Sequence, residues 1–136
     1  TAVSVANSCR YRAMSHGGYL RQHSDAPMMA SHVLHDYTKS DLDSQTMGVL
    51  DCAVELALTL ASVERADVEK LHSLGLTDEQ ILSTALITAY FNLMNRLANG
   101  LGVELPPGCQ DAQERWMNKG AASQEWLMGK KVSTTA

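Results

Sequence analysis

The sequence predicts an all-α protein, a helical bundle of about six helices. Apolar residues recur at spacings of three and four through most of the chain, which is the periodicity of amphipathic helices. Strand signals are nearly absent, because only 5% of residues are aromatic and no segment sustains apolar/polar alternation. The 136 residues suffice for one domain with a real core, so residues 1–136 are expected to form a single domain whose last residues, 130–136, are a loose tail.

The four helices expected in the first half of the chain each have a local signal. Gly17 and Gly18 weaken the first helix but permit close contact with another helix. Pro27 is favoured in the first turn of the second helix, and Gly75 is a natural stop for the fourth. These helices are predicted over residues 2–21, 27–37, 44–60 and 65–74.

The fifth helix has the clearest start. Thr77 and Gln80 form a capping box, in which each side chain bonds the other residue's backbone amide. The helix runs about 20 residues to glycines at 100 and 102. It carries an apolar stripe of Leu82, Leu86, Tyr90, Leu93, Leu97 and Leu101. It also carries a polar stripe of Asn92, Asn95, Arg96 and Asn99, for which a solvated face and a buried or subunit-facing hydrogen-bonding seam both stay open.

A last helix is predicted over residues 112–128. It carries Trp116 and Trp126, which are expected to anchor it to the bundle or to another subunit. Pro106 and Pro107 make a rigid turn before it.

Composition narrows the classes of function. The net charge of −4 leaves no basic footprint for nucleic acid, and no apolar run reaches the roughly 18 residues of a membrane span. Thr1 leads straight into a patterned segment without the features of a signal peptide. Three cysteines, an odd number, are typical of reduced thiols, so a cytoplasmic location is expected.

Cys9, Arg12 and His16 form the most informative group. On one helix, residues three, four and seven apart share a face, so these side chains are expected on one surface. A thiol beside a cation and an imidazole can be held as the thiolate, which is its reactive form. A lone Cys9 is equally consistent with a small buried core residue.

Two segments together resemble the alkylhydroperoxidase D-like, or carboxymuconolactone decarboxylase, superfamily, in its peroxidase-related branch. The first is Asn7-x-Cys9-x-Tyr11-Arg12-x-x-x-His16-Gly17, which matches the branch's Asn-x-Cys-x-Tyr-Cys-x-x-x-His-Gly except at Arg12. The second runs from Gly75 to Glu104 and is similar to the branch's penultimate long helix. The resemblance covers residues 3–105.

The resemblance implies an all-helical protein that assembles into homo-oligomers, as dimers, trimers or hexamers. It also implies a redox dithiol that reduces hydroperoxides, with a His and an upstream Glu as a proton relay. By position, Cys9 matches the first cysteine and His16 the relay His, whereas Arg12 replaces the second cysteine. Tyr11 stands where some members have His. The relay Glu would precede Thr1, and the domain is expected to lack its N-terminal helices.

The leading hypothesis is therefore an antioxidant oxidoreductase, a peroxidase with peroxiredoxin activity and no cofactor. Cys9 attacks a hydroperoxide, His16 shuttles the proton, Tyr11 and Arg12 support them, and a thiol is the reductant. Cys52 or Cys109 could resolve the product only if the fold brings one close.

Two alternatives stay open. One is a decarboxylase-like proton-transfer enzyme in which His16 is the acid/base. The other is a non-catalytic binding or structural oligomer that kept the fold. His32 and His35 lie three apart, but no carboxylate or thiol completes a ligand set, so no metal site is expected.

Overall fold

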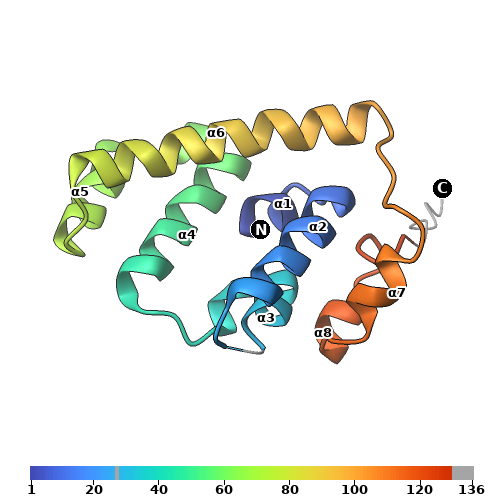
Figure 1. Cartoon of the computed structure of the whole chain (residues 1–136). Helices are drawn as coiled ribbons and strands as arrows, with labels where there is room; N and C mark the ends of the chain where they lie inside the picture. The colour runs from blue at the N-terminus through green and yellow to red at the C-terminus, as the bar shows by residue number, and fades with distance from the viewer. Residues whose placement is uncertain (27, 130–136) are drawn as a thin grey trace.

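A single long helix, α6 (Asp78–Gly100), spans the molecule, and the other helices pack below it (Figure 1). In the computed structural model, residues 1–26 and 28–129 are described, and within them there are eight α-helices and no strand. The predicted all-α class is therefore confirmed. The other helices are α1 (Ala2–Ala6), α2 (Arg10–His23), α3 (Met29–His35), α4 (Ser44–Leu58), α5 (Arg65–Ser73), α7 (Cys109–Glu114) and α8 (Lys119–Ala122), with short 3₁₀ turns at Tyr37–Lys39 and Leu60–Ser62.

The core of the molecule lies where α2 and α3 meet the C-terminal segment. Met14, Leu34 and Leu127 are fully buried there, with Ala13 and Ala121 between them. The glycines predicted to permit close contact do so. A Cβ at Gly17 would lie 2.9 Å from Leu34 Cδ1, and one at Gly18 would overlap the Gln113 side chain. The two tryptophans, Trp116 and Trp126, pack half-buried against this core, so they anchor the C-terminal segment to it.

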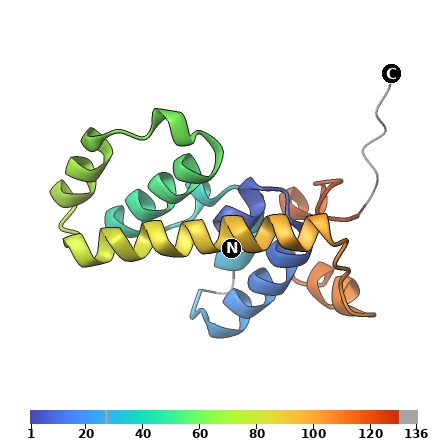
Figure 2. The same ribbon diagram turned by 90° about the horizontal axis from the view of Figure 1, so that it is seen from above.

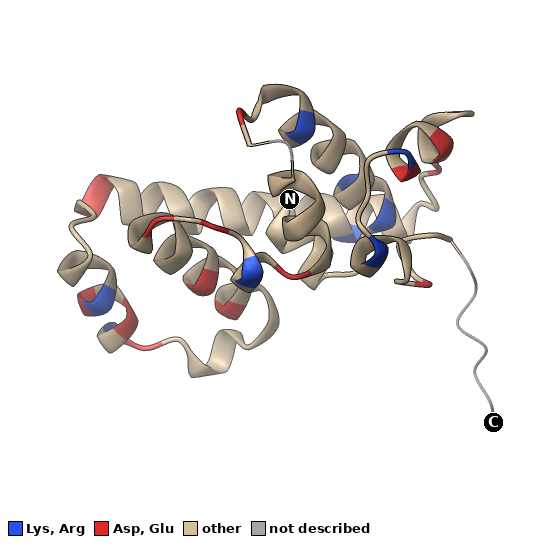
Figure 3. Ribbon diagram, turned by 90° about the horizontal axis from the view of Figure 1, so that it is seen from below, with Lys and Arg blue, Asp and Glu red and all other residues tan. Residues whose placement is uncertain are grey.

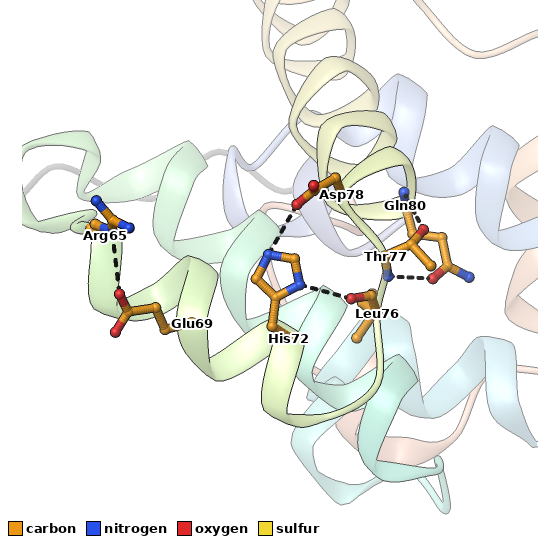
Figure 4. Close-up of polar contacts among 7 residues, drawn as sticks. All are labelled: Arg65, Glu69, His72, Leu76, Thr77, Asp78 and Gln80. Atoms are coloured by element: carbon orange, nitrogen blue, oxygen red, sulfur yellow. Dashed lines mark hydrogen bonds and ion pairs between the residues drawn. The ribbon is translucent and has the colours of Figure 1, made fainter.

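The corner between α5 and α6 is held by polar contacts (Figure 4). The predicted capping box is confirmed, since Thr77 Oγ1 accepts from the Gln80 amide at 3.3 Å and Gln80 Oε1 accepts from the Thr77 amide at 2.8 Å. The His72 ring bridges the two helices, because Nδ1 lies 3.0 Å from the Leu76 carbonyl and Nε2 lies 3.0 Å from Asp78 Oδ1. These contacts fix the direction in which α6 leaves the corner.

Two predicted helices are split in the structure, which explains eight helices in place of about six. The helix expected over 2–21 breaks at residues 7–9, where Ser8 adopts a left-handed conformation with φ of 49°. The helix expected over 112–128 is replaced by α7 and α8. Pro27 and the predicted tail, residues 130–136, lie outside the described residues.

Charged residues of both signs are interspersed over the molecule, and most of α6 carries neither (Figure 3). Among residues 1–26 and 28–129, no helix combines the length and apolar character needed to cross a bilayer.

Candidate functional site

The break between α1 and α2 places Cys9 outside both helices. Cys9 is the N-cap of α2, with φ of −87° and ψ of 90°, so the expectation that it shares one continuous helix with His16 is wrong. Its amide donates to the Ser4 carbonyl at 2.9 Å, and its carbonyl accepts from the Ala13 amide at 2.8 Å. Cys9 therefore lies at the N-terminus of a 14-residue helix, the end at which the helix dipole favours negative charge.

The Cys9 side chain is fully enclosed, with 0% of its surface exposed. Its sulfur makes no hydrogen bond to Arg12, His16 or any other side chain of the described residues. All three cysteines are free thiols, and Cys52 and Cys109 are each half-buried. The structure therefore shows no disulfide partner for Cys9.

Arg12 and His16 do meet, as their spacing of four on α2 predicts. Arg12 Nη1 lies 3.3 Å from His16 Nε2. A guanidinium can only donate, so Nε2 is the acceptor and the imidazole is neutral with its proton on Nδ1. Burial lowers the pKa of His16, and the positive charge of Arg12 lowers it further. The pair therefore consists of a cation and a neutral base.

Arg12 has a second donor, its Nε–H group, which His16 does not use. Its Nε is buried and has no acceptor among the described residues. An N–H group that is buried without a partner loses its hydration without compensation. Because Arg12 lies one helical turn after Cys9, this free donor is located on the turn that follows the thiol.

The segment that leads to Cys9 is tied to α6 by a polar seam, formed by the buried Ser4 and Asn95 and the half-buried Asn7 and Asn92. Ser4 Oγ donates to Asn95 Oδ1 at 3.1 Å, and Asn7 Nδ2 donates to Asn92 Oδ1 at 2.8 Å. Asn95 Nδ2 also donates to the Val3 carbonyl at 3.4 Å. The polar stripe of α6 is thus a hydrogen-bonding seam at the half-buried Asn92 and the buried Asn95, whereas Arg96 and Asn99 are exposed.

Phe91 of α6 completes the surroundings of His16. The two rings meet edge to face with centroids 4.9 Å apart and an interplanar angle of 68°. Sequence reasoning did not single out Phe91, Ser4 or Asn7 as supports of the site. The polar stripe of α6 was the available signal for the seam, and nothing local indicated Phe91.

The remaining candidate residues make no hydrogen bond to Cys9, Arg12 or His16. Tyr11 is half-buried and makes no side-chain hydrogen bond to a described residue. His32 is half-buried and His35 is exposed on α3. In the part of the chain that the structure describes, no three His, Cys, Asp or Glu side chains gather as they would around a metal ion.

Comparison with known proteins adds a second line of observation. The sequence matches no protein-family model, and a search of curated proteins finds no match. Solved structures do match. An uncharacterised peroxidase-related protein of Ralstonia eutropha JMP134, with an alkylhydroperoxidase AhpD core, superposes with a TM-score of 0.74 at 36% identity. An uncharacterised peroxidase-related protein of Silicibacter sp. TM1040 superposes with a TM-score of 0.72 at 30% identity.

The two matches cover most of this chain but only part of the matched proteins. They include 79% and 78% of this chain, respectively. The chain spans 57% and 58% of the length of those two structures.

Proposed function

We propose that this chain, which belongs to the peroxidase-related branch of the alkylhydroperoxidase D-like superfamily, reduces hydroperoxides with Cys9 as its single peroxidatic thiol. The observation that carries the proposal is the placement of Cys9 at the N-terminus of α2, one turn before a buried Arg12 Nε–H that has no acceptor. A helix N-terminus and a nearby cation both stabilise the negative charge that develops on the oxygen leaving the hydroperoxide.

The first step forms one bond and breaks another. When Arg12 turns to the incoming hydroperoxide, His16 Nε2 is released, and local opening lets the Cys9 thiol pass its proton to it; the thiolate then attacks the terminal oxygen of the hydroperoxide. An S–O bond forms as the O–O bond breaks, which leaves a sulfenic acid on Cys9. The departing alkoxide recovers the proton from His16 and leaves as an alcohol. Arg12 supplies a positive charge and a donor to the developing oxyanion.

The second step needs an external thiol, because Arg12 stands where a resolving cysteine would be. A reductant thiol attacks the Cys9 sulfur, water leaves, and a mixed disulfide forms. A second reductant thiol then attacks that disulfide and releases Cys9. One hydroperoxide and two thiols thus give one alcohol, one water and one external disulfide.

The test compares cysteine variants of the full chain in thiol-dependent consumption of cumene hydroperoxide. Cys9→Ser is expected to abolish the activity, whereas Cys52→Ser and Cys109→Ser, the matched controls, are expected to keep it. Dimedone should label Cys9 alone after exposure to peroxide. Undiminished turnover in Cys9→Ser would end the proposal.

Access to Cys9 gives a second, independent test. Since the thiol is fully enclosed, a local opening must precede attack, and a small peroxide should react faster than a bulky one. Equal rates for hydrogen peroxide and cumene hydroperoxide would mean that the enclosed thiol is not the reacting group.

A second candidate function is proton transfer by His16 on a lactone or keto acid, and the neutral state of His16 favours it. A substrate carboxylate that drew the Arg12 guanidinium away would leave Nε2 free to act as a base. This activity would survive in Cys9→Ser and disappear in His16→Ala. The peroxidase reaction is instead lost in Cys9→Ser, so that variant separates the two functions.

A further inference from the structure

Cys9 lies between two parts of the chain that are held in place differently. On one side is α1, whose Ser4 carbonyl accepts from the Cys9 amide and which the seam joins to α6. On the other side is the C-terminal segment, residues 109–129, which Figures 1 and 2 show beside α2 at the end of the molecule opposite α5. Its Leu127 packs in the same buried cluster as Ala13, which follows Cys9 by four residues and so lies on the same side of the first turn of α2.

Arg10, which follows the thiol directly in the chain, joins the first turn of α2 to the C-terminal segment. Its Nε donates to the Leu127 carbonyl at 2.9 Å, and its Nη2 donates to Gln110 Oε1. Gln110 Nε2 in turn donates to the Met128 carbonyl at 3.3 Å. A Cβ at Gly129 would lie 3.0 Å from Arg10 Cζ, so the chain passes close over the guanidinium. Both acceptors of the Arg10 side chain therefore belong to the C-terminal segment.

The other polar contacts of the segment to the helical core are to α3. Gln124 Nε2 donates to the Leu34 carbonyl at 2.7 Å, and the Asn118 amide donates to Ser31 Oγ. Along the later part of α2, a cavity of about 460 Å³ lies between α2 and α7. It is lined by Gly18, Arg21, Gln22, Ala112, Gln113 and Trp116. The segment can therefore move away from the first turn of α2 while its bonds to α3 remain.

The cost of separating each part from Cys9 indicates which of them moves. The seam contains the bond between Ser4 and Asn95, and both of these side chains are buried, so breaking it leaves polar groups without water or a partner. Arg10 and Gln110 are half-buried, so water can hydrate them as they separate. The movement also lifts Leu127 from the core, which keeps the closed form dominant. The C-terminal segment is thus the part that opens at the lower cost.

We propose that the C-terminal segment is a gate over Cys9 and that Arg10 holds it closed as a positioning residue. The role of the gate in catalysis rests on the proposed peroxidase function, because that reaction needs a local opening at the thiol. Its effect on the accessibility of Cys9 does not rest on that function. The segment lies beyond residues 3–105, which resemble the peroxidase-related branch, so the resemblance does not imply the gate.

The first test measures the rate at which N-ethylmaleimide alkylates Cys9, by mass spectrometry of the peptide that contains it. Arg10→Met should raise this rate about tenfold or more, because the opening equilibrium limits attack on an enclosed group. Loss of a cation beside the thiol would by itself lower the thiolate fraction and slow the reaction, so an increase reports access. Arg65→Met is the matched control and should not change the rate, because Arg65 pairs only with Glu69 on α5.

Two further variants separate the gate from a general loss of stability. Gln110→Ala breaks the other half of the contact without a change of charge and should also raise the alkylation rate. Asn95→Ala weakens the fold from the seam side, so for the same loss of unfolding free energy in urea it should raise the rate much less. An unchanged rate in both Arg10→Met and Gln110→Ala would overturn the proposal. So would a rate that depends on unfolding free energy alone in all three variants.

Peroxide reduction by the same variants connects the gate with the chemistry. In Arg10→Met the rates for hydrogen peroxide and cumene hydroperoxide should converge, because the open form admits both. Faster alkylation of Cys9 without any peroxide reduction would support the gate and end the proposed function alone. Peroxide reduction with an unchanged preference for the smaller peroxide and unchanged alkylation would overturn the gate and leave the peroxidase reaction standing.

Discussion

The region around α2 and the region around α6 bury their apolar residues in different ways. In the first, α2, α3 and the C-terminal segment enclose Met14, Leu34 and Leu127 completely. In the second, α6 buries Thr88, Asn95 and Ala98 against its neighbours, and its leucines are exposed to solvent. The first region buries its large apolar side chains within the described part of the chain, whereas the second leaves large apolar side chains exposed to solvent. The difference shows that the site region closes its apolar core within the described residues, whereas the α6 surface leaves large apolar side chains exposed.

The largest effect that tests this comparison is expected in the core. Leu34→Ala removes a fully buried side chain that closes over Gly17, so it should lower the free energy of unfolding by about 2–5 kcal/mol. Leu86→Ala, at a mostly exposed position of α6, should change it by less than about 0.5 kcal/mol. Urea unfolding measures both. Equal losses would remove the distinction between the two regions.

The second-largest loss of unfolding free energy is expected at the polar seam that joins α1 to α6. Asn95→Ala leaves the buried Ser4 hydroxyl without its partner and removes one of the two donors to the Val3 carbonyl, which keeps the Asn7 amide, at a cost of about 1–3 kcal/mol in unfolding free energy. Asn99→Ala, one turn along the same helix and exposed, should cost little. Combining Asn95→Ala with Ser4→Ala should cost less than the sum of the two single changes. Additive losses in urea unfolding would mean that the two side chains do not interact.

The cap of α6 should have a smaller effect. Thr77→Ala removes the acceptor for the Gln80 amide and should lower the unfolding free energy by about 1 kcal/mol. Thr77→Ser keeps a hydroxyl and should restore most of that stability. Thermal unfolding of the two variants measures the difference. A serine variant as unstable as the alanine variant would show that the loss comes from packing of the Thr methyl group.

The smallest expected effect is a pH dependence at the site. The pKa of His16 is lowered in the fold, so the unfolded chain binds a proton more readily than the folded one. Stability should therefore fall as the pH drops from the ordinary His value near 6.5 to the lower folded value, and stay level below that value. His16→Gln should flatten this slope in unfolding measured between those limits. In Arg12→Met, an NMR titration should show the pKa of His16 moving up toward its ordinary value. No movement would exclude Arg12 as a cause of the lowered pKa.

Local patterns were sufficient for much of the fold. The capping box at Thr77 depends on four consecutive residues, so it was predictable without knowledge of the tertiary structure. The helices predicted over 44–60 and 65–74 are present as Ser44–Leu58 and Arg65–Ser73 for the same reason. The contact between Arg12 and His16 likewise follows from a spacing of four on one helix.

The break before Cys9 was not predictable from local patterns. Residues 2–21 have a helical pattern throughout, whereas the structure breaks it at Ser8 and joins α1 to α6 through the seam, between residues more than 80 positions apart. The prediction of one helix over residues 112–128 was wrong for a related reason. Leu127 and the two tryptophans fold back onto the core of α2 and α3, which a continuous helix would not allow.

The sequence by itself determined an all-α chain, the start of α6, and the chemistry available at positions 9, 12 and 16. Only the tertiary structure decided that Cys9 caps α2 and is enclosed, and that α6 turns its leucines outward. Helical periodicity defines which residues share a face of a helix, because that depends on backbone geometry alone. It does not define which face is buried, because that depends on the partners that the rest of the chain, or another copy of it, presents.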